Sequence, residues 1–264
     1  MGRLTLFYKM NDNNIKLIIG NHGGGKSTYI YNYFLDNCIN VDGTLDLDKK
    51  FYLVVPEQDT QDKQDMIIGL AKKQNHGIFN IDVISFDRLF YMVCKELNIN
   101  IDREKIIDDD IKRLVLRLAL QNLEKNGTEF IYFKNMKNKV GFTDKLKSAM
   151  SELYSYNIDK EVIDKVLLKT DNDRLKEKMQ ELSLIQEEFK KILKDKDFSI
   201  QEDKLNILYK IIDKSHICDN AVFAFDGFTG FTPIQKDIFY KICEKSKETY
   251  VSIDIRDVDV KSII

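Results

Sequence analysis

A glycine-rich segment between an apolar run and a helix-forming stretch constrains this chain more than any other feature. Residues 20–27 read Gly-Asn-His-Gly-Gly-Gly-Lys-Ser, which fits the spacing G-x-x-x-x-G-K-[ST]. The apolar run Ile15–Ile19 precedes it, and apolar residues at spacings of three and four follow it, which predicts a buried strand and then a helix. This order of strand, loop and helix is the context of a phosphate-binding loop. A glycine-rich turn that binds nothing is the alternative interpretation.

Each residue type in the loop has a chemical reason to be there. Glycines allow successive backbone amides to turn toward phosphate oxygens, and the start of the following helix adds its positive dipole end. Lys26 is long enough to contact the terminal phosphates, and the Ser27 hydroxyl is a ligand for Mg²⁺. We therefore expect ATP and Mg²⁺ to bind here, with the nucleotide held by Gly20, Asn21, His22, Gly23, Gly24, Gly25, Lys26, Ser27 and Thr28.

A second candidate for the same chemistry follows the apolar run Ala221–Phe225. Asp226 stands where that strand should end, and we expect the strand to lie beside the loop strand, so that Asp226 holds through a water the Mg²⁺ that Ser27 ligates. Lys26 and Asp226 are then the candidate catalytic residues. Strands also end in Asp before Gly as ordinary turn chemistry. Gly227 and Phe228 occupy positions where an efficient hydrolase would often carry a glutamate, so the sequence supports binding more strongly than hydrolysis.

The remaining pattern predicts an α/β fold. Apolar strand-like runs at 51–55, 78–84, 221–225 and 248–255 are separated by helical segments, which is typical of a parallel sheet covered by helices.

The middle of the chain is different, because it contains no proline and its apolar residues recur with helical spacing. One such set consists of Ile111, Leu114, Val115 and Leu118. Since the strand pattern resumes afterwards, the simplest topology is a sheet domain interrupted by an all-helical insertion. We assign residues 1–100 and 219–264 to a P-loop domain and residues 101–218 to the insertion.

Polar residues follow the second and third predicted strands, at the edge of the sheet where ligands bind in open α/β folds. Gln58, Ser85 and Arg88 are candidates for contacts to a nucleic-acid backbone, and Phe86 is a candidate for stacking on a base. The alternative is that Ser85 caps a helix and Phe86 belongs to the core.

Composition excludes several classes of protein. The net charge is −2, so any nucleic-acid contact must come from a local patch, and no apolar run approaches the roughly 18 residues of a membrane span. The four cysteines are never closer than 25 positions (243 minus 218), and the three histidines lack metal-ligand spacing, so neither a disulfide framework nor a zinc site is predicted. We expect a cytoplasmic protein without membrane contact.

Four segments in this order resemble the N-terminal part of the AddB family, also called RexB. They are the loop, Val-Val-Pro-Glu-Gln at 54–58, Ile-Ser-Phe-Asp-Arg-Leu at 84–89, and Asp-Gly-Phe-Thr-Gly-Phe-Thr-Pro at 226–233. The last segment is the most specific, and the similarity covers nearly the whole chain. It implies a RecA-like domain of the superfamily 1 helicase type with a helical subdomain inserted.

The resemblance also implies a function. Members are the B components of bacterial ATP-dependent helicase/nucleases that work with an A subunit, AddA or RexA, on DNA ends in double-strand break repair, and that contribute to Chi recognition. The nuclease and iron–sulfur cysteines of the family lie toward the C-terminus of much longer chains. We therefore expect a fragment without the second RecA-like domain, which would bind nucleotide weakly and hydrolyse it poorly.

Two other functions fit the residues. A free-standing P-loop kinase or ATPase would use the helical block as a substrate lid. A non-catalytic DNA-binding scaffold would retain the loop without binding nucleotide.

Overall fold

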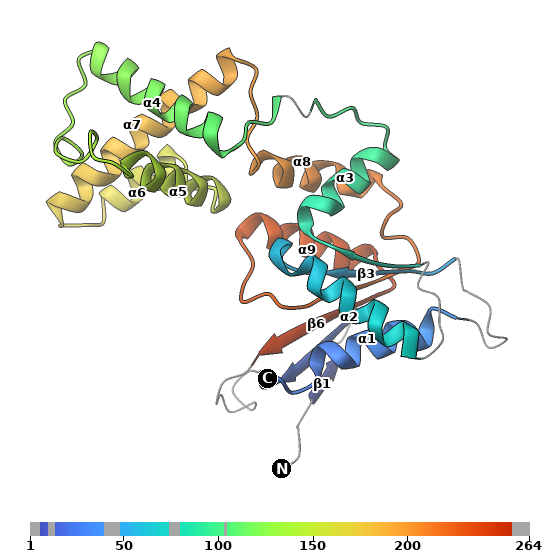
Figure 1. Cartoon of the computed structure of the whole chain (residues 1–264). Helices are drawn as coiled ribbons and strands as arrows, with labels where there is room; N and C mark the ends of the chain where they lie inside the picture. The colour runs from blue at the N-terminus through green and yellow to red at the C-terminus, as the bar shows by residue number, and fades with distance from the viewer. Residues whose placement is uncertain (1–5, 10–13, 40–47, 74–79, 103–104, 255–264) are drawn as a thin grey trace. The chain divides into compact units, whose positions relative to one another are not determined.

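The computed structural model shows two compact units in the part of the chain that it describes (Figure 1). The described residues are 6–9, 14–39, 48–73, 80–102 and 105–254. We call the first unit the sheet unit and the second the helical unit. The sheet unit lies within residues 1–99, 207–231 and 235–264, and the helical unit lies within residues 100–206 and 232–234.

The sheet unit contains six strands in the order β1-β2-β6-β5-β3-β4. Their bounds are β1 (Leu6–Lys9), β2 (Ile15–Gly20), β3 (Lys50–Val54), β4 (Ile81–Ile84), β5 (Ala221–Phe225) and β6 (Glu248–Asp254). Five strands run parallel, and β1 pairs antiparallel with β2. Every residue of β5 is buried, as expected for a central strand of a sheet that is covered on both faces.

The sheet unit also contains helices and two 3₁₀ turns. They are α1 (Lys26–Asn37), the 3₁₀ turn η1 (Glu57–Asp59), α2 (Thr60–Lys73), α3 (Phe86–Glu96), the second half of α8 (Asp203–Ile211), the 3₁₀ turn η3 (Ile212–Lys214) and, except for its first two residues, α9 (Pro233–Lys245). Ile30 and Phe34 of α1 pack with Ile67 of α2 on Leu53 and Val222 of the sheet, and all five are at most 3% exposed. Burying a side chain of this size contributes about 1.5–3 kcal/mol, so this face holds α1 and the loop before it in place.

The helical unit contains α4 (Asp109–Lys125), α5 (Phe142–Ser155), α6 (Lys160–Leu167), α7 (Asp173–Asp195) and the first half of α8. Asp108, Asp159 and Asn172 begin three of these helices, because each side chain accepts a hydrogen bond from the amide three residues later. Leu116 and Phe189 are fully buried in the core of the unit.

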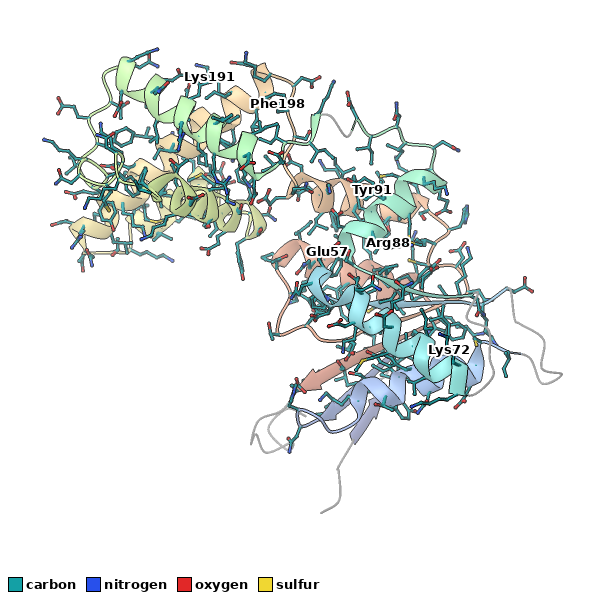
Figure 2. All side chains as sticks on the ribbon, viewed as in Figure 1. Glu57, Lys72, Arg88, Tyr91, Lys191 and Phe198 are labelled. Carbon is teal, nitrogen blue, oxygen red and sulfur yellow. The ribbon has the colours of Figure 1, made fainter. Side chains whose placement is uncertain are left out.

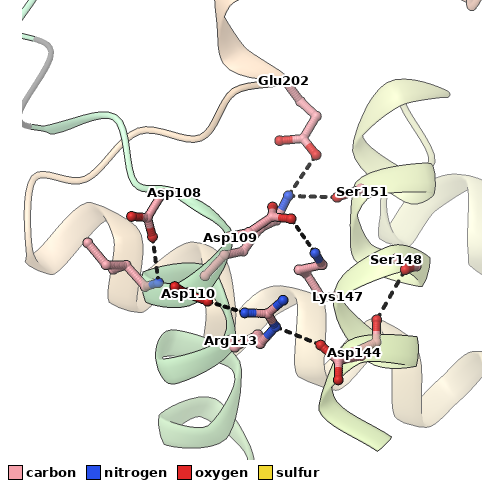
Figure 3. Close-up of polar contacts among 11 residues, drawn as sticks. Asp108, Asp109, Asp110, Arg113, Asp144, Lys147, Ser148, Ser151 and Glu202 are labelled. Carbon is pink, nitrogen blue, oxygen red and sulfur yellow. Dashed lines mark hydrogen bonds and ion pairs between the residues drawn. The ribbon is translucent and has the colours of Figure 1, made fainter. Parts of the chain in front are cut away.

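Ion pairs join α4 to α5 within the helical unit (Figure 3). Arg113 pairs with Asp110 and with Asp144, and Lys147 pairs with Asp109. Buried Lys112 donates to Ser151 Oγ at 2.8 Å and to Glu202 Oε1 at 2.6 Å, which also ties the segment before α8 to this helix pair.

The predicted α/β class with a parallel sheet is confirmed. Strand β1 was not predicted, and α6 and α8 lie in the block that was predicted to be all-helical, without a helix of their own having been assigned. Residues 207–218, which it placed in the helical insertion, group with the sheet unit. The start of the third predicted strand, at 78–79, and the last residue of the fifth, at 255, lie outside the described residues. In the described part of the chain, no helix has the length and apolarity to cross a bilayer.

Candidate nucleotide site at the carboxyl edge of the sheet

The carboxyl ends of the five parallel strands meet at one edge of the sheet, and the predicted site residues gather there. Gly20 at the end of β2 lies opposite Asp254 at the end of β6. Phe225 at the end of β5 pairs with Val54 of β3, so Asp226 emerges at the same edge. The expectation that the Asp226 strand lies directly beside the loop strand is wrong, because β6 lies between β2 and β5. That intervening strand brings Asp254 to the loop.

The loop holds a tight conformation that its glycines permit. Gly23 and Gly25 have φ of 70° and 91°, in the left-handed region that favours glycine. The Gly24 amide donates to the Asn21 carbonyl at 2.9 Å, and a Cβ on Gly24 would lie 2.8 Å from that oxygen. A side chain at this position would therefore force the backbone open. Gly25 is also the N-cap of α1, where no side chain caps the free amides of the first turn.

Lys26 is buried at the start of α1, with 7% of its surface exposed. Its ammonium donates to the Gly20 carbonyl at 3.0 Å and to the Asn21 carbonyl at 2.9 Å, and it forms an ion pair with Asp254. The side chain therefore turns back over the loop, with its charge at the mouth of the loop.

Asp226 is the most buried carboxylate at this edge among the described residues, with 2% of its surface exposed. Ser252 Oγ donates to it at 2.5 Å, Tyr31 Oη at 3.1 Å and Lys63 Nζ at 3.2 Å, and the Ser27 hydroxyl is a further hydrogen-bond donor. Burial raises the pKa of Asp226, but the hydrogen bonds from Ser252 and Ser27 and the charge of Lys63 outweigh it, so the pKa is below its ordinary value. Asp226 is therefore ionised at neutral pH.

The pKa of Tyr31 is shifted in the opposite direction, upward. Burial raises the pKa of its phenol, and the neighbouring Asp226 charge raises it further, so Tyr31 remains a hydrogen-bond donor at neutral pH.

The glycines of the loop, Lys26 and Asp226 line one cleft of about 340 Å³ in the sheet unit. The lining consists of His22, Gly23, Gly24, Gly25, Lys26, Ser27, Thr28, Lys63, Asp226, Gly227, Phe228, Ser252 and Asp254. The structure thus brings the predicted loop together with Asp226, although the two are separated by about 200 positions in the sequence.

The comparison with known proteins decides the family. Residues 17–262 match the family described as ADDB, N-terminal. The chain belongs to this AddB N-terminal family. The predicted resemblance is therefore confirmed.

Relatives of this AddB N-terminal chain are named as the B component of an ATP-dependent helicase/deoxyribonuclease. The one from Lachnoclostridium phytofermentans is 29% identical over 247 residues, the one from Clostridium perfringens strain SM101 is 30% identical over 245, and the one from Ruminiclostridium cellulolyticum is 30% identical over 252. The alignments cover 93–94% of this chain and 20–21% of the relatives. The AddB N-terminal chain thus spans about a fifth of the length of these relatives.

The groups that line the cleft fit a nucleotide with bound Mg²⁺. Backbone amides of a glycine loop at a helix start and the Lys26 ammonium are donors for phosphate oxygens. Ser27 and Asp226 are oxygen donors of the kind that Mg²⁺ takes when it keeps several waters. Among the described residues, the cleft included, no group of three or more His, Cys, Asp and Glu residues has the arrangement of a metal site, and all four cysteines are buried free thiols.

The two positions after Asp226, where a hydrolase would often carry a glutamate that orients water, are not acidic. Gly227 has φ of 81°, and Phe228 lines the cleft. A carboxylate does lie close to this turn in the described structure, that of Asp59, whose Oδ2 would be 3.4 Å from a Cβ built on Gly227.

The four candidate DNA contacts of the AddB N-terminal chain divide into two pairs. Ser85 is 3% exposed and caps α3, because its hydroxyl accepts from the Arg88 amide at 3.2 Å. Phe86 is 5% exposed, and its ring packs against the rings of Phe225 at 6.1 Å and Phe228 at 5.8 Å. The capping and core interpretation therefore describes these two residues, and a buried ring is not free to stack on a base.

The other pair, Gln58 and Arg88, is exposed beyond the ends of the adjacent strands β3 and β4. Figure 2 shows Arg88 near the start of α3, with Glu57 of η1 following β3. Both positions remain candidates for polar contacts at this edge.

Sequence reasoning missed four side chains of the site: Tyr31, Lys63, Ser252 and Asp254. Asp254 carries the same signal as Asp226, an acid at the end of an apolar strand, and the same rule would have found it. Tyr31 lies on α1 and Lys63 lies on α2, and nothing in the sequence distinguishes either residue from its neighbours.

Proposed function

We propose that this chain is the ATP-binding, RecA-like N-terminal region of the B component of a heterodimeric ATP-dependent helicase/exonuclease that processes DNA double-strand breaks. Membership of the AddB N-terminal family and the names of its relatives support the assembly. The observation that carries nucleotide binding is the loop conformation, with Lys26 at its mouth and Asp226 beside Ser27 in the same cleft.

In this proposal, the residues of the cleft have separate roles. The amides at the start of α1 and the Lys26 ammonium bind the phosphates of ATP, and Ser27 and Asp226 hold Mg²⁺. When bound, Mg²⁺ would neutralise part of the negative charge of the phosphates. Lys63 and Ser252 keep Asp226 oriented and ionised.

The proposal also includes slow hydrolysis of ATP by the isolated chain. Gly227 and Phe228 offer no carboxylate to orient an attacking water, so we expect the isolated chain to bind nucleotide and hydrolyse little of it. In the full complex, an A subunit and DNA ends would be the partners, and a contribution to Chi recognition fits a component whose site binds more than it hydrolyses.

Gly24→Ala tests whether the loop conformation carries binding. The added Cβ would meet the Asn21 oxygen at 2.8 Å without changing any charge. We expect binding of a fluorescent ATP analogue with Mg²⁺ to weaken at least about tenfold, because the amides that face the phosphates are displaced.

Gly69→Ala is the matched control. Gly69 lies within α2, and a Cβ there meets nothing within 4 Å. This variant should bind as the wild type does and gain up to about 1 kcal/mol of stability, since alanine is the better helix former. Equal binding by both variants, with both folded by circular dichroism, would contradict the proposed site.

A further inference from the structure

The Lys26 ammonium is fully used by acceptors inside the protein. An ammonium has three hydrogens to donate. Its three acceptors here are the Gly20 carbonyl, the Asn21 carbonyl and a carboxylate oxygen of Asp254. A phosphate oxygen that binds Lys26 must therefore replace one of them.

We propose that Asp254 is a built-in competitor of the nucleotide, which holds Lys26 until a phosphate displaces it and thereby sets the affinity of the cleft. This inference rests on the proposed function, and it assigns to Asp254 a regulatory role at the same site.

Asp254 is the acceptor that can leave. The two carbonyls belong to the loop backbone and stay at the Lys26 ammonium as long as the loop keeps its conformation. Asp254 is instead a side chain at the last described residue of β6, fixed opposite Gly20 by the strand register, with 56% of its side chain exposed. Rotation of this side chain toward solvent leaves the rest of the loop intact.

The surroundings of Asp254 differ from those of Asp226, which argues against a second magnesium carboxylate. Asp226 is 2% exposed and has four donors around it. The ion-pair partners of Asp254 in the described structure are Lys26 and, at 3.9 Å, the exposed ring of His22. A half-exposed carboxylate that lines the cleft repels nucleotide phosphates, so Asp254 opposes binding twice, by occupying Lys26 and by its own charge.

Asp254→Asn tests this competition with almost no change of shape. We expect the variant to bind the magnesium ATP analogue about 2- to 5-fold more tightly, in the range of a partly exposed ion pair. The gain should be smaller for adenosine, which has no phosphate to take the ammonium, and it should shrink at high salt because exposed charges are screened.

Asp36→Asn is the control, since it removes the same charge from the exposed side of α1. Unchanged or weaker binding by Asp254→Asn would overturn the inference, provided that the wild type binds and that Gly24→Ala weakens binding. Absence of binding by the wild type and by Asp254→Asn alike would overturn the proposed function and the inference with it. Binding by Asp254→Asn alone would support both.

Discussion

At the scale of single residues, the site depends on charges held by partners from distant parts of the sequence. Asp226 stays ionised although it is buried, because it accepts hydrogen bonds from Ser252 of β6, Lys63 of α2 and Ser27 of α1. The motif identifies Lys26 and Asp226 from their own neighbours in the chain. The partners of Asp226 could not be predicted, since the topology alone brings β6 between β2 and β5.

The lowered pKa of Asp226 predicts how its carboxylate contributes to stability. A carboxyl group whose folded-state pKa lies below its unfolded value of about 3.8 stabilises the fold above that pH, and the contribution is lost as the pH falls through the folded pKa. Asp226→Asn cannot ionise, so we expect the wild type to lose more free energy of unfolding than the variant between pH 6 and pH 2.

Urea denaturation across this pH range measures the difference. Asp237→Asn, at an exposed position on α9, controls for the loss of a carboxylate as such. Parallel pH profiles for the wild type and Asp226→Asn would show that the carboxylate is not stabilised in the folded state.

At the scale of elements, one buried carboxylate orders the connection between α4 and α5. Glu181 of α7 is 6% exposed and accepts from three successive amides, those of Ile131 at 2.5 Å, Tyr132 at 2.7 Å and Phe133 at 2.9 Å. A carboxylate that accepts several backbone amides makes strong, charge-assisted hydrogen bonds. Glu181 therefore substitutes for the regular structure that residues 126–141 lack.

Glu181→Ala should destabilise the helical unit by about 3 kcal/mol, because it leaves buried amides without an acceptor. Thermal or urea unfolding followed by far-UV circular dichroism measures the loss. Glu177→Ala on the same helix is the control and should stay within about 0.5 kcal/mol of the wild type. Equal effects of the two substitutions would exclude an anchoring role for Glu181.

The helical spacing around Ile111 predicted a helix correctly but does not identify the face that is buried. The expected helix around Ile111 is α4, yet Ile111, Leu114 and Leu118 are 38%, 60% and 38% exposed. The core instead receives Leu116, Ala119, Leu120 and Leu123 together with Val115. Nearly every position of this helix between 114 and 120 is apolar or a long basic side chain, so spacing alone could not choose between two overlapping stripes.

At the scale of the whole molecule, the family and the broad fold followed from the sequence, and the limits of the units did not. The motif segments lie at ends of the strands β2, β3, β4 and β5, where the chain order of a parallel sheet places them. The return from the helical unit to the sheet unit occurs within α8, and a continuous helix gives no signal in the sequence that a unit ends inside it.

Nucleotide binding by the sheet unit is tested most directly by a titration in which one lysine is changed. A fluorescent ATP analogue with Mg²⁺, at fixed salt, would be added to the wild type, to Lys26→Ala and to Lys72→Ala, which removes an exposed charge near the end of α2 (Figure 2). We predict saturable binding by the wild type and Lys72→Ala, and at least about a tenfold loss in Lys26→Ala. Equal binding by all three chains, or none by the wild type, would contradict the account.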